Sequence, residues 1–236
     1  MTGDSNGELL RIRRAYARRT RTYDPLSPWV YLGRQERERA LIRWVQTCGL
    51  VPLSQRRLIE LGCGTGGNLI ELLRLGFSPA NLVGNDLLPE RIEVARERLP
   101  ASVRLIEGDA SDVILPNESF DVVFQSMMCS SILDDHLLLR IAQRMWALVR
   151  PGGGVLWYDF TYSNPHNPDV RGISIQRIRE LFPASKARVW RVTLAPPISR
   201  AVTRIHPVLY CLFNSMPFLR THLLCWLPKG MVRSRN

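Results

Sequence analysis

The sequence has few cysteines, few lysines and no long uninterrupted apolar run. Its five cysteines are widely spaced and form no C-x-x-C pair, which argues against a metal site and a disulfide framework. The most apolar stretch, residues 205–227, is interrupted by His206, Pro217 and Arg220 at intervals too short for a bilayer core. The chain also becomes arginine-rich before any apolar segment of a secretory signal appears. We therefore expect a cytoplasmic protein without a membrane span.

Acidic residues are scarce at both ends of the chain, so the formal net charge of +11 is unevenly distributed. Ten arginines lie within residues 11–43, and twelve basic residues lie within 171–236 against a single acid, Glu180. Residues 46–165 carry ten basic and fourteen acidic residues. Basic ends suit peripheral contact with an anionic membrane, here the inner face of the cell membrane, or a phosphorylated acceptor. An arginine-rich composition alone accounts for them equally well.

Between residues 57 and 160, apolar runs of strand length alternate with amphipathic runs of helix length. Such alternation predicts parallel βαβ units with right-handed crossovers and helices on both faces of a sheet. The expected strands are 57–61, 81–86, 103–107, 120–125 and 154–160, and the expected helices are 66–75, 89–99 and 134–149.

The flanking segments follow a different pattern. Residues 1–50 are expected to form a basic helical extension, with helices at 8–20 and 34–50, that closes over the site as a lid through Tyr16, Arg19 and Tyr23. The remainder, 51–236, is expected to be one domain in which 161–220 are insertions on the acceptor side. This part should contain a short helix at 174–182, a strand at 187–194, a proline-broken helical stretch and a last strand at 221–227.

The segment "RRLIELGCGTGGNLIELL", residues 56–73, places a glycine-rich turn between a strand and a helix. Glycines at that junction let the backbone approach a nucleotide and leave helix N–H groups free to donate. Gly62 and Gly64 begin both a G-x-G-x-G and a G-x-G-x-x-G pattern, so the glycines alone do not identify the ligand. Glu60 would face like charge beside a pyrophosphate, whereas it would attract a ligand that carries an ammonium group.

Two further carboxylates follow the next two expected strands. Asp86 could accept from both hydroxyls of a ribose, and Asp109 could accept from an adenine amino group. Because parallel strands end at the same edge of a sheet, these carboxylates and Glu60 should lie close together. The pattern predicts a nucleoside that carries an amino acid, namely S-adenosylmethionine.

Five segments in order carry a family resemblance: "LIELGCGTGGNL", "VGNDLLPERIEVAR", "EGDASD", "FDVVFQSM" and "RMWALVRPGGGVLWYDF". They resemble the successive motifs of class I S-adenosylmethionine-dependent methyltransferases, in the group that includes the ubiquinone/menaquinone methyltransferases. The resemblance covers residues 55–160 and implies a Rossmann-like α/β fold, with a seven-stranded mixed sheet whose last strand is antiparallel. From residue 161 onward, "NPHNPDVRG", "LFP", "TLAPP" and "LRTHLL" are similar to segments of methyltransferases of bacterial polysaccharide assembly.

The resemblance also implies contacts to the cofactor, position by position. The methionine part would be held by the glycine loop and its neighbours, the ribose by an acid, and the adenine by two apolar residues and a second acid. Glu60, Gly62, Gly64 and Gly66 would line the methionine part, and Asp86 would bind the ribose. Leu87 and Ala110 would contact the faces of the adenine, and Asp109 would bind its amino group. Cys63, Asn68 and Gln125 complete the expected set.

Methyl transfer is an in-line displacement, and it needs a general base only where the acceptor is a hydroxyl group. Three residues on the loops after the fourth and fifth strands are candidates for that base: Asp159, His136 and His166. Each has a structural alternative, since Asp159 could cap the next turn and both histidines could face solvent. Met127, Met128 and Cys129 could form an apolar acceptor wall or belong to the core.

We expect O-methylation of a sugar hydroxyl, in a cell-surface glycan or a related small or lipid-linked acceptor. Asn164, Asn167 and Arg171, in the loop 161–171, could hydrogen-bond such a ligand. Alternatives are a quinone- or lipid-type C- or O-methyltransferase, an RNA methyltransferase, and a binding protein that keeps the fold without catalysis. The fourth strand ends in "QSMM" and not in an N-P-P-Y-type motif, and no aromatic-plus-basic module is present, so we do not expect a nucleic-acid partner.

Overall fold

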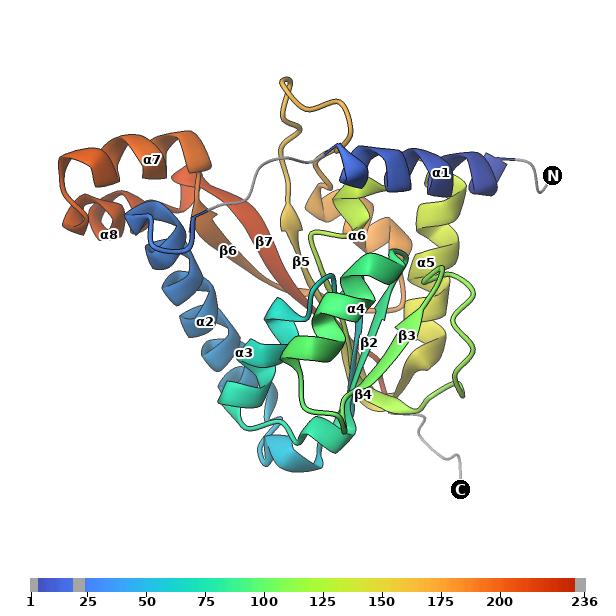
Figure 1. Ribbon diagram of the computed structural model, residues 1–236. Coiled ribbons are helices and arrows are strands. Elements are labelled where there is room, and N and C mark those ends of the chain that lie inside the picture. Colours follow the sequence, from blue (N-terminus) through green and yellow to red (C-terminus); the bar gives the residue numbers. More distant parts are fainter. Residues whose placement is uncertain (1–3, 19–23, 232–236) are drawn as a thin grey trace.

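The computed structural model describes residues 4–18 and 24–231, which form a seven-stranded sheet in the order β3-β2-β1-β4-β5-β7-β6 (Figure 1). The first five strands pair in parallel, and β7 runs antiparallel to both of its neighbours. The expected mixed sheet with an antiparallel last strand is therefore confirmed. The strands are β1 (Leu58–Leu61), β2 (Leu82–Asp86), β3 (Arg104–Glu107), β4 (Phe120–Ser126), β5 (Val149–Phe160), β6 (Arg188–Leu194) and β7 (Arg220–Pro228).

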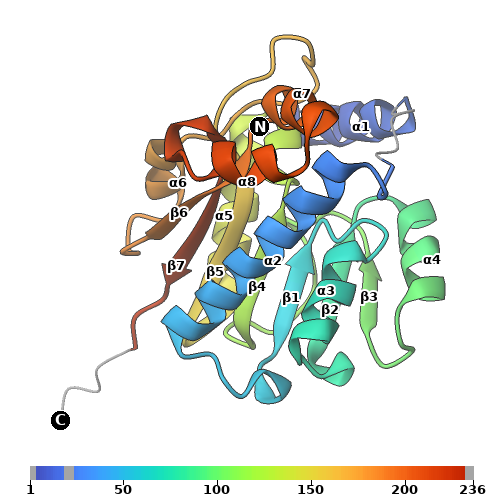
Figure 2. The same ribbon diagram turned by 90° about the vertical axis from the view of Figure 1, so that its left-hand side faces the viewer.

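Helices cover both faces of this sheet (Figures 1 and 2). One face packs against α2, α3 and α4, and the other packs against α5 and α6. Helix α1 lies across the edge where the parallel strands end, while α7 and α8 form an insertion between β6 and β7. The helices are α1 (Asp4–Ala17), α2 (Pro28–Cys48), α3 (Gly67–Leu75), α4 (Pro89–Arg98), α5 (Asp135–Leu148), α6 (Ile175–Leu181), α7 (Pro196–Ile205) and α8 (Val208–Asn214).

The central strands are apolar because both of their faces are covered. All four residues of β1 are buried, as are six of the seven residues of β4. Successive side chains point to opposite faces, so Leu58 belongs to the cluster under α2 and α3 while Ile59 belongs to the cluster under α5. Trp44 of α2 and Trp157 of β5 are fully buried on these two faces.

The structure shifts three expected boundaries. Helix α2 begins at Pro28 and not at residue 34, because proline at the first helical position fits the helix and ends the preceding connection. Helix α1 begins at Asp4 and not at residue 8. Strand β5 begins at Val149 and runs through the glycines of "RPGGG", which were expected to precede it.

Helix α2 is part of the core, since Leu41, Trp44 and Val45 pack in the same cluster as residues of α3 and α4. The division of the chain at residue 50 stays a prediction. Within the described residues, no helix is both long and apolar enough to span a membrane.

Gly153 of β5 provides a test of how closely the sheet packs. A Cβ atom there would lie 2.5 Å from the carbonyl oxygen of Asp121, which is backbone and has no room to move. We expect Gly153→Ala to lower the free energy of unfolding by about 1–3 kcal/mol, the usual cost of overpacking. As a control, Gly7→Ala in α1 should raise the free energy of unfolding by about 0.5–1 kcal/mol, because no atom lies within 4 Å of the position of its Cβ atom. Urea unfolding checks both values, and equal effects would contradict the close packing at Gly153.

Candidate functional site

A cavity of about 260 Å³ opens at the edge where the parallel strands end. Its floor is formed by the turns after β1, β2, β3 and β4, and its roof by α1. Five of the residues predicted to hold a cofactor line this cavity together: Gly62, Asp86, Leu87, Asp109 and Ala110. Ligands in open α/β sheets bind at this edge, so the position itself favours a binding site.

The glycine loop bends from β1 toward the end of β2 before α3 begins. The backbone of Gly62, Gly64 and Gly66 has φ values of 73°, 55° and 78°, a left-handed conformation that favours glycine. The N–H of Gly62 donates to the carbonyl oxygen of Asn85 at 2.8 Å, and the N–H of Gly64 donates to Asp86 Oδ2 at 2.7 Å. These bonds tie the loop to β2 and fix its inner side against the cavity.

Local hydrogen bonds orient the two carboxylates on the cavity wall. Asp86 is 6% exposed, and its Oδ1 accepts from the N–H of Leu88 at 3.0 Å, opposite the bond to Gly64. Asp109 Oδ1 and Oδ2 accept from the N–H and Oγ of Ser111, both at 2.8 Å. Backbone and hydroxyl donors therefore hold both carboxylates in place on the cavity wall, and Asp109 Oδ2 also lies 3.6 Å from the guanidinium of Arg140 on α5.

Glu60 lies behind this wall and does not line the cavity. It is fully buried, and its Oε1 accepts from Asn68 Nδ2 at the start of α3. Burial raises the pKa of Glu60 to about 8, although the Asn68 amide and the Arg37 guanidinium lower it in part. Its Oε2 has no hydrogen-bond partner among the described residues. An ammonium group of a ligand near that oxygen would lower the pKa of Glu60 again. The contact between Glu60 and such an ammonium group stays a prediction.

The other residues of the expected cofactor set also act from behind the cavity. Gln125 is fully buried, and its Oε1 accepts from the N–H groups of Met128 and Cys129 at 3.2 and 3.3 Å. Gly66 is the N-cap of α3 and packs against Leu99. Burial raises the pKa of the Cys63 thiol, which fits a packing role. These residues shape the loops that line the cavity and do not form its surface.

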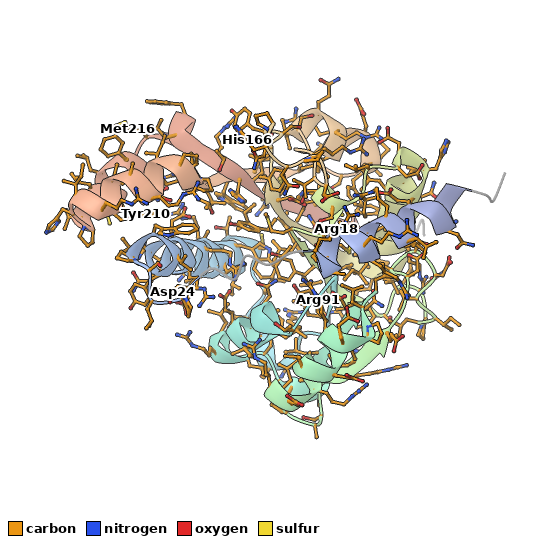
Figure 3. All side chains as sticks on the ribbon, turned by 45° about the horizontal axis from the view of Figure 1, so that its top comes forward. Arg18, Asp24, Arg91, His166, Tyr210 and Met216 are labelled. Atoms are coloured by element: carbon orange, nitrogen blue, oxygen red, sulfur yellow. The ribbon has the colours of Figure 1, made fainter. Side chains whose placement is uncertain are left out.

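The structure does not bring the three candidate bases together, and none of them lines the cavity. Asp159 is 1% exposed, and its Oδ2 accepts from the N–H of Ser130 at 3.0 Å while its Oδ1 accepts from the N–H of Phe160 at 3.0 Å. Burial raises the pKa of Asp159 to about 7, against the hydrogen bonds from Ser130. His136 in the first turn of α5 is exposed, as is His166 in the loop 161–172, which Figure 3 labels. Asp159 therefore holds the turn that follows β4, a contact different from the capping of the next turn after β5 that was its structural alternative.

That turn supplies part of the cavity wall. Met127 has a φ of 60°, which is unusual for a residue with a side chain and is typical of strained functional loops. The side chain of Met128 lies directly over Gly62, since a Cβ atom on Gly62 would meet it at 2.7 Å. Both methionines line the cavity, as does Ser131, which sequence reasoning missed. Met127 and Met128 thus lie at the cavity surface, whereas Cys129 is buried in the core, and a contact of either methionine with an acceptor stays a prediction.

Helix α1 forms the roof through Leu9, Ile12 and Tyr16, which recur at spacings of three and four along one helix face. The guanidinium of Arg91 on α4 lies 4.2 Å from the centre of the Tyr16 ring, and the Tyr16 hydroxyl is hydrogen-bonded to Ser131 Oγ at 3.1 Å. Figure 3 shows Arg91 near the end of α1 that carries Arg18. Of the residues expected to form the lid, Arg19 and Tyr23 lie outside the described residues.

A buried carboxylate fastens the roof to the start of α5. Glu8 Oε1 accepts from the N–H of Leu133 at 2.6 Å, and its Oε2 accepts from Arg11 Nε at 2.8 Å. Arg11 also donates to the carbonyl oxygen of Ser131 and lies 3.6 Å from Asp169 in the loop 161–172. The helix is therefore held to two loops at the cavity mouth. The only signal of these contacts in the sequence is the apolar stripe of α1, since hydrogen bonds over such distances leave no local pattern.

The known proteins to which this sequence is similar are methyltransferases. Residues 58–153 match the family model described as a methyltransferase domain. The phthiotriol/phenolphthiotriol dimycocerosates methyltransferase of Mycobacterium leprae is 36% identical over 121 residues, which are 50% of this chain and 43% of that protein. The fatty-acid O-methyltransferase of Mycolicibacterium smegmatis is 32% identical over 48% of this chain and 40% of its own length. The demethylmenaquinone methyltransferase of Deinococcus radiodurans is 31% identical over 45% of this chain and 44% of its own length. This chain spans less than half the length of these relatives.

Solved structures share the fold over most of the chain. An S-adenosylmethionine-dependent methyltransferase from Mesorhizobium loti has a TM-score of 0.57 at 17% identity, over 78% of this chain and 96% of that one. A second such methyltransferase, from Archaeoglobus fulgidus, has a TM-score of 0.58 at 13% identity, over 84% and 98%. The likeness at these identities concerns the fold.

Glu8 offers a test of the roof. Burial raises its pKa, but the bonds from Arg11 and Leu133 outweigh burial and hold the pKa below its ordinary value of 4.5. The ionised form therefore stabilises the closed roof above that value, and the contribution is lost as the pH falls through the lowered pKa. We expect Glu8→Gln to speed hydrogen exchange in α1 at neutral pH, and its difference in melting temperature from the native protein to shrink below about pH 4.

Glu97→Gln, which changes an exposed carboxylate of α4, is the matched control and should alter neither measurement. If Glu8→Gln leaves exchange in α1 unchanged, the roof is held by other contacts.

Proposed function

We propose that the protein transfers the methyl group of S-adenosylmethionine to a lipid-type acceptor, because residues 58–153 match a methyltransferase domain and the sheet has the fold of S-adenosylmethionine-dependent methyltransferases. The expected family and fold are confirmed, and S-adenosylmethionine is the cofactor of this domain class. The observation that carries the proposal is one cavity lined at once by Gly62, Asp86 and Asp109, under an apolar roof.

The cavity residues fit a nucleoside that carries an amino acid. Asp86 presents a fixed carboxylate to the hydroxyls of a ribose, and Leu87 and Ala110 offer apolar contact to an adenine ring. Asp109, which lines the cavity and is held by Ser111, would accept from the adenine amino group. Beside the glycine loop, Glu60 Oε2 is a buried acceptor without a partner among the described residues, as a site for an ammonium group requires. The cavity surface thus offers partners for the nucleoside part of the ligand, while the carboxylate of Glu60 lies behind that surface.

The reaction needs alignment and the exclusion of water more than it needs acid or base. The sulfonium of the cofactor supplies the activated methyl group. Ile12 of the roof, together with Met127 and Met128 of the turn after β4, lines part of the cavity with apolar side chains, which would exclude water from around the bound reactants. The chain holds this wall rigid through Gln125 and Asp159, which bind the backbone of the turn from behind. These residues are therefore assigned to positioning the reactants.

The acceptor is proposed to be apolar because the polar side chains expected to bind a sugar have other partners. Asn164 Oδ1 accepts from the N–H of His166 at 3.0 Å, Asn167 Oδ1 accepts from the N–H of Asp169 at 3.2 Å, and Arg171 is paired with Asp135. They organise the loop 161–172 itself. O-methylation of a sugar hydroxyl stays a prediction without a contact that supports it, whereas the apolar cavity wall and relatives named for lipid, fatty-acid and quinone substrates support the lipid-type acceptor.

Asp86→Asn tests the cofactor site. The amide cannot accept from Gly64, Leu88 and a ribose as the carboxylate can, so affinity for S-adenosylmethionine should fall about tenfold to a hundredfold, the scale of one lost charge-assisted hydrogen bond. Isothermal titration calorimetry measures the change. Asp112→Asn, an exposed carboxylate close to the cavity but outside it, is the control and should bind normally. Equal affinities of both variants would place the cofactor elsewhere.

Asp159→Asn separates a positioning role from general-base catalysis. The amide oxygen can still accept from the N–H of Ser130, so turnover on the methyl acceptor should fall by about tenfold or less, whereas loss of a general base costs about 10² or more.

Transfer of a labelled methyl group to bacterial lipid extract and to cell-surface polysaccharide, measured side by side, identifies the acceptor class. Label in polysaccharide, together with a loss beyond 10², would restore Asp159 as the base of a sugar O-methyltransferase.

A further inference from the structure

The segment 196–219, which contains α7, α8 and the short turn Pro217–Leu219, forms a lobe that the seven-stranded sheet does not require. We call it the α7–α8 lobe. It is inserted between β6 and β7, and in Figures 1 and 2 it lies at the same end of the molecule as α1 and the loop 161–172. The lobe therefore shares the end at which the cavity opens.

The inner side of the lobe accounts for its packing. Val202 of α7 and Tyr210 of α8 are buried against Leu194 of β6, with Leu32 of α2 packed beside them. The Tyr210 hydroxyl lies 3.7 Å from the position of a Cβ atom on Gly33 of α2, and Figure 3 shows this side chain between α8 and α2. These inner contacts hold the lobe against the sheet and α2, and the side chains on its outer side take no part in them.

The outer side is nevertheless apolar. Ile205, Val208, Leu212 and Phe218 are 78%, 64%, 55% and 74% exposed, and they come from α7, α8 and the turn after α8, which contact one another in that order. Single exposed apolar side chains are ordinary, but a group of four large ones on adjoining elements marks an interaction surface.

Positive charge accompanies this apolar surface. No aspartate or glutamate occurs from residue 181 to the end of the sequence, while this stretch contains nine arginines and lysines. Within the lobe, Arg204 is exposed and forms no ion pair among the described residues, and Arg200 lies 5.6 Å from the ring centre of Trp29 at the start of α2. The lobe combines exposed aliphatic side chains with uncompensated cations.

We propose that the α7–α8 lobe docks onto the surface of an anionic lipid bilayer. Aliphatic side chains that enter the boundary between headgroups and acyl chains, with arginines beside them on anionic headgroups, are the pattern of interfacial helices. A second copy of this chain would bring the same positive charges together, and a single-stranded nucleic acid would require stacking aromatic rings in place of Ile205, Val208 and Leu212. Docking through the lobe would bring the cavity end of the molecule toward the lipid. The inference does not depend on methyl transfer.

Co-sedimentation with vesicles tests the proposal. The probes are vesicles of phosphatidylcholine alone and vesicles that also contain phosphatidylglycerol, each at low and physiological salt. The native protein should bind the anionic vesicles, and its binding should fall as salt screens the arginines. The double variant Leu212→Ser with Phe218→Ser should bind them at least about tenfold more weakly, because two apolar side chains no longer enter the bilayer. Arg204→Glu should weaken binding as well.

Two matched controls keep the result specific to the lobe. Ile114→Ser removes a side chain that is 92% exposed in the loop after β3, and Arg96→Glu reverses an exposed charge on α4. A control that weakens binding as strongly as its counterpart in the lobe would overturn the proposal. So would equal binding to neutral and anionic vesicles, or a lobe variant that abolishes self-association or RNA binding while it leaves vesicle binding unchanged. Unaltered affinity of the lobe variants for S-adenosylmethionine shows that they remain folded.

Discussion

The hydrogen bonds that Asp86 accepts are the contacts on which the site depends. One carboxylate joins the glycine loop to the end of β2, because Oδ2 binds the N–H of Gly64 and Oδ1 binds the N–H of Leu88. Both amides belong to turns that would otherwise leave donors unsatisfied next to a cavity. The carboxylate therefore accepts from one backbone N–H after β1 and one after β2, and it remains on the cavity wall, where a ligand hydroxyl can reach it. Structure and binding require the same charge at the same place.

Local pattern was sufficient to predict the sheet and the loop. Strands β1, β2 and β4 are covered on both faces, and their burial appears in the sequence as short apolar segments that are interrupted by single polar residues such as Glu60 and Asp121. Gly62 and Gly64 mark a turn that requires a left-handed backbone. The first turn of α2 was misplaced because Pro28, which begins the helix, has the same local appearance as a proline that interrupts one.

The depth of each polar side chain could not be predicted in the same way. Glu60, Gln125 and Asp159 stand at strand ends, where spacing places a side chain near the site but does not show on which side of the wall it lies. All three prove to be buried behind the wall and bound to the backbone or to Asn68. The roof was also beyond local pattern, since the bond from the Leu133 N–H to Glu8 joins residues 125 positions apart. Only the apolar stripe of α1, which follows helical spacing, indicated that the helix covers something.

The placement of polar groups also bears on the chemistry. Gln125 and Asp159 accept from backbone amides of the turn after β4, and Asn164, Asn167 and Arg171 bind within the loop 161–172 or to α5. The cavity wall at that turn is therefore mainly apolar, with Met127, Met128 and Ile132 beside Ser131. An apolar site of this kind gains its selectivity from the area it buries, and it needs its substrate delivered out of an apolar phase. A lobe with exposed aliphatic side chains at the same end of the molecule would meet that need without any change in the sheet, since its inner side alone holds it in place. In the proposed function, cofactor recognition would rest on the first two-thirds of the chain, and the means of reaching the acceptor would lie in the insertions after it.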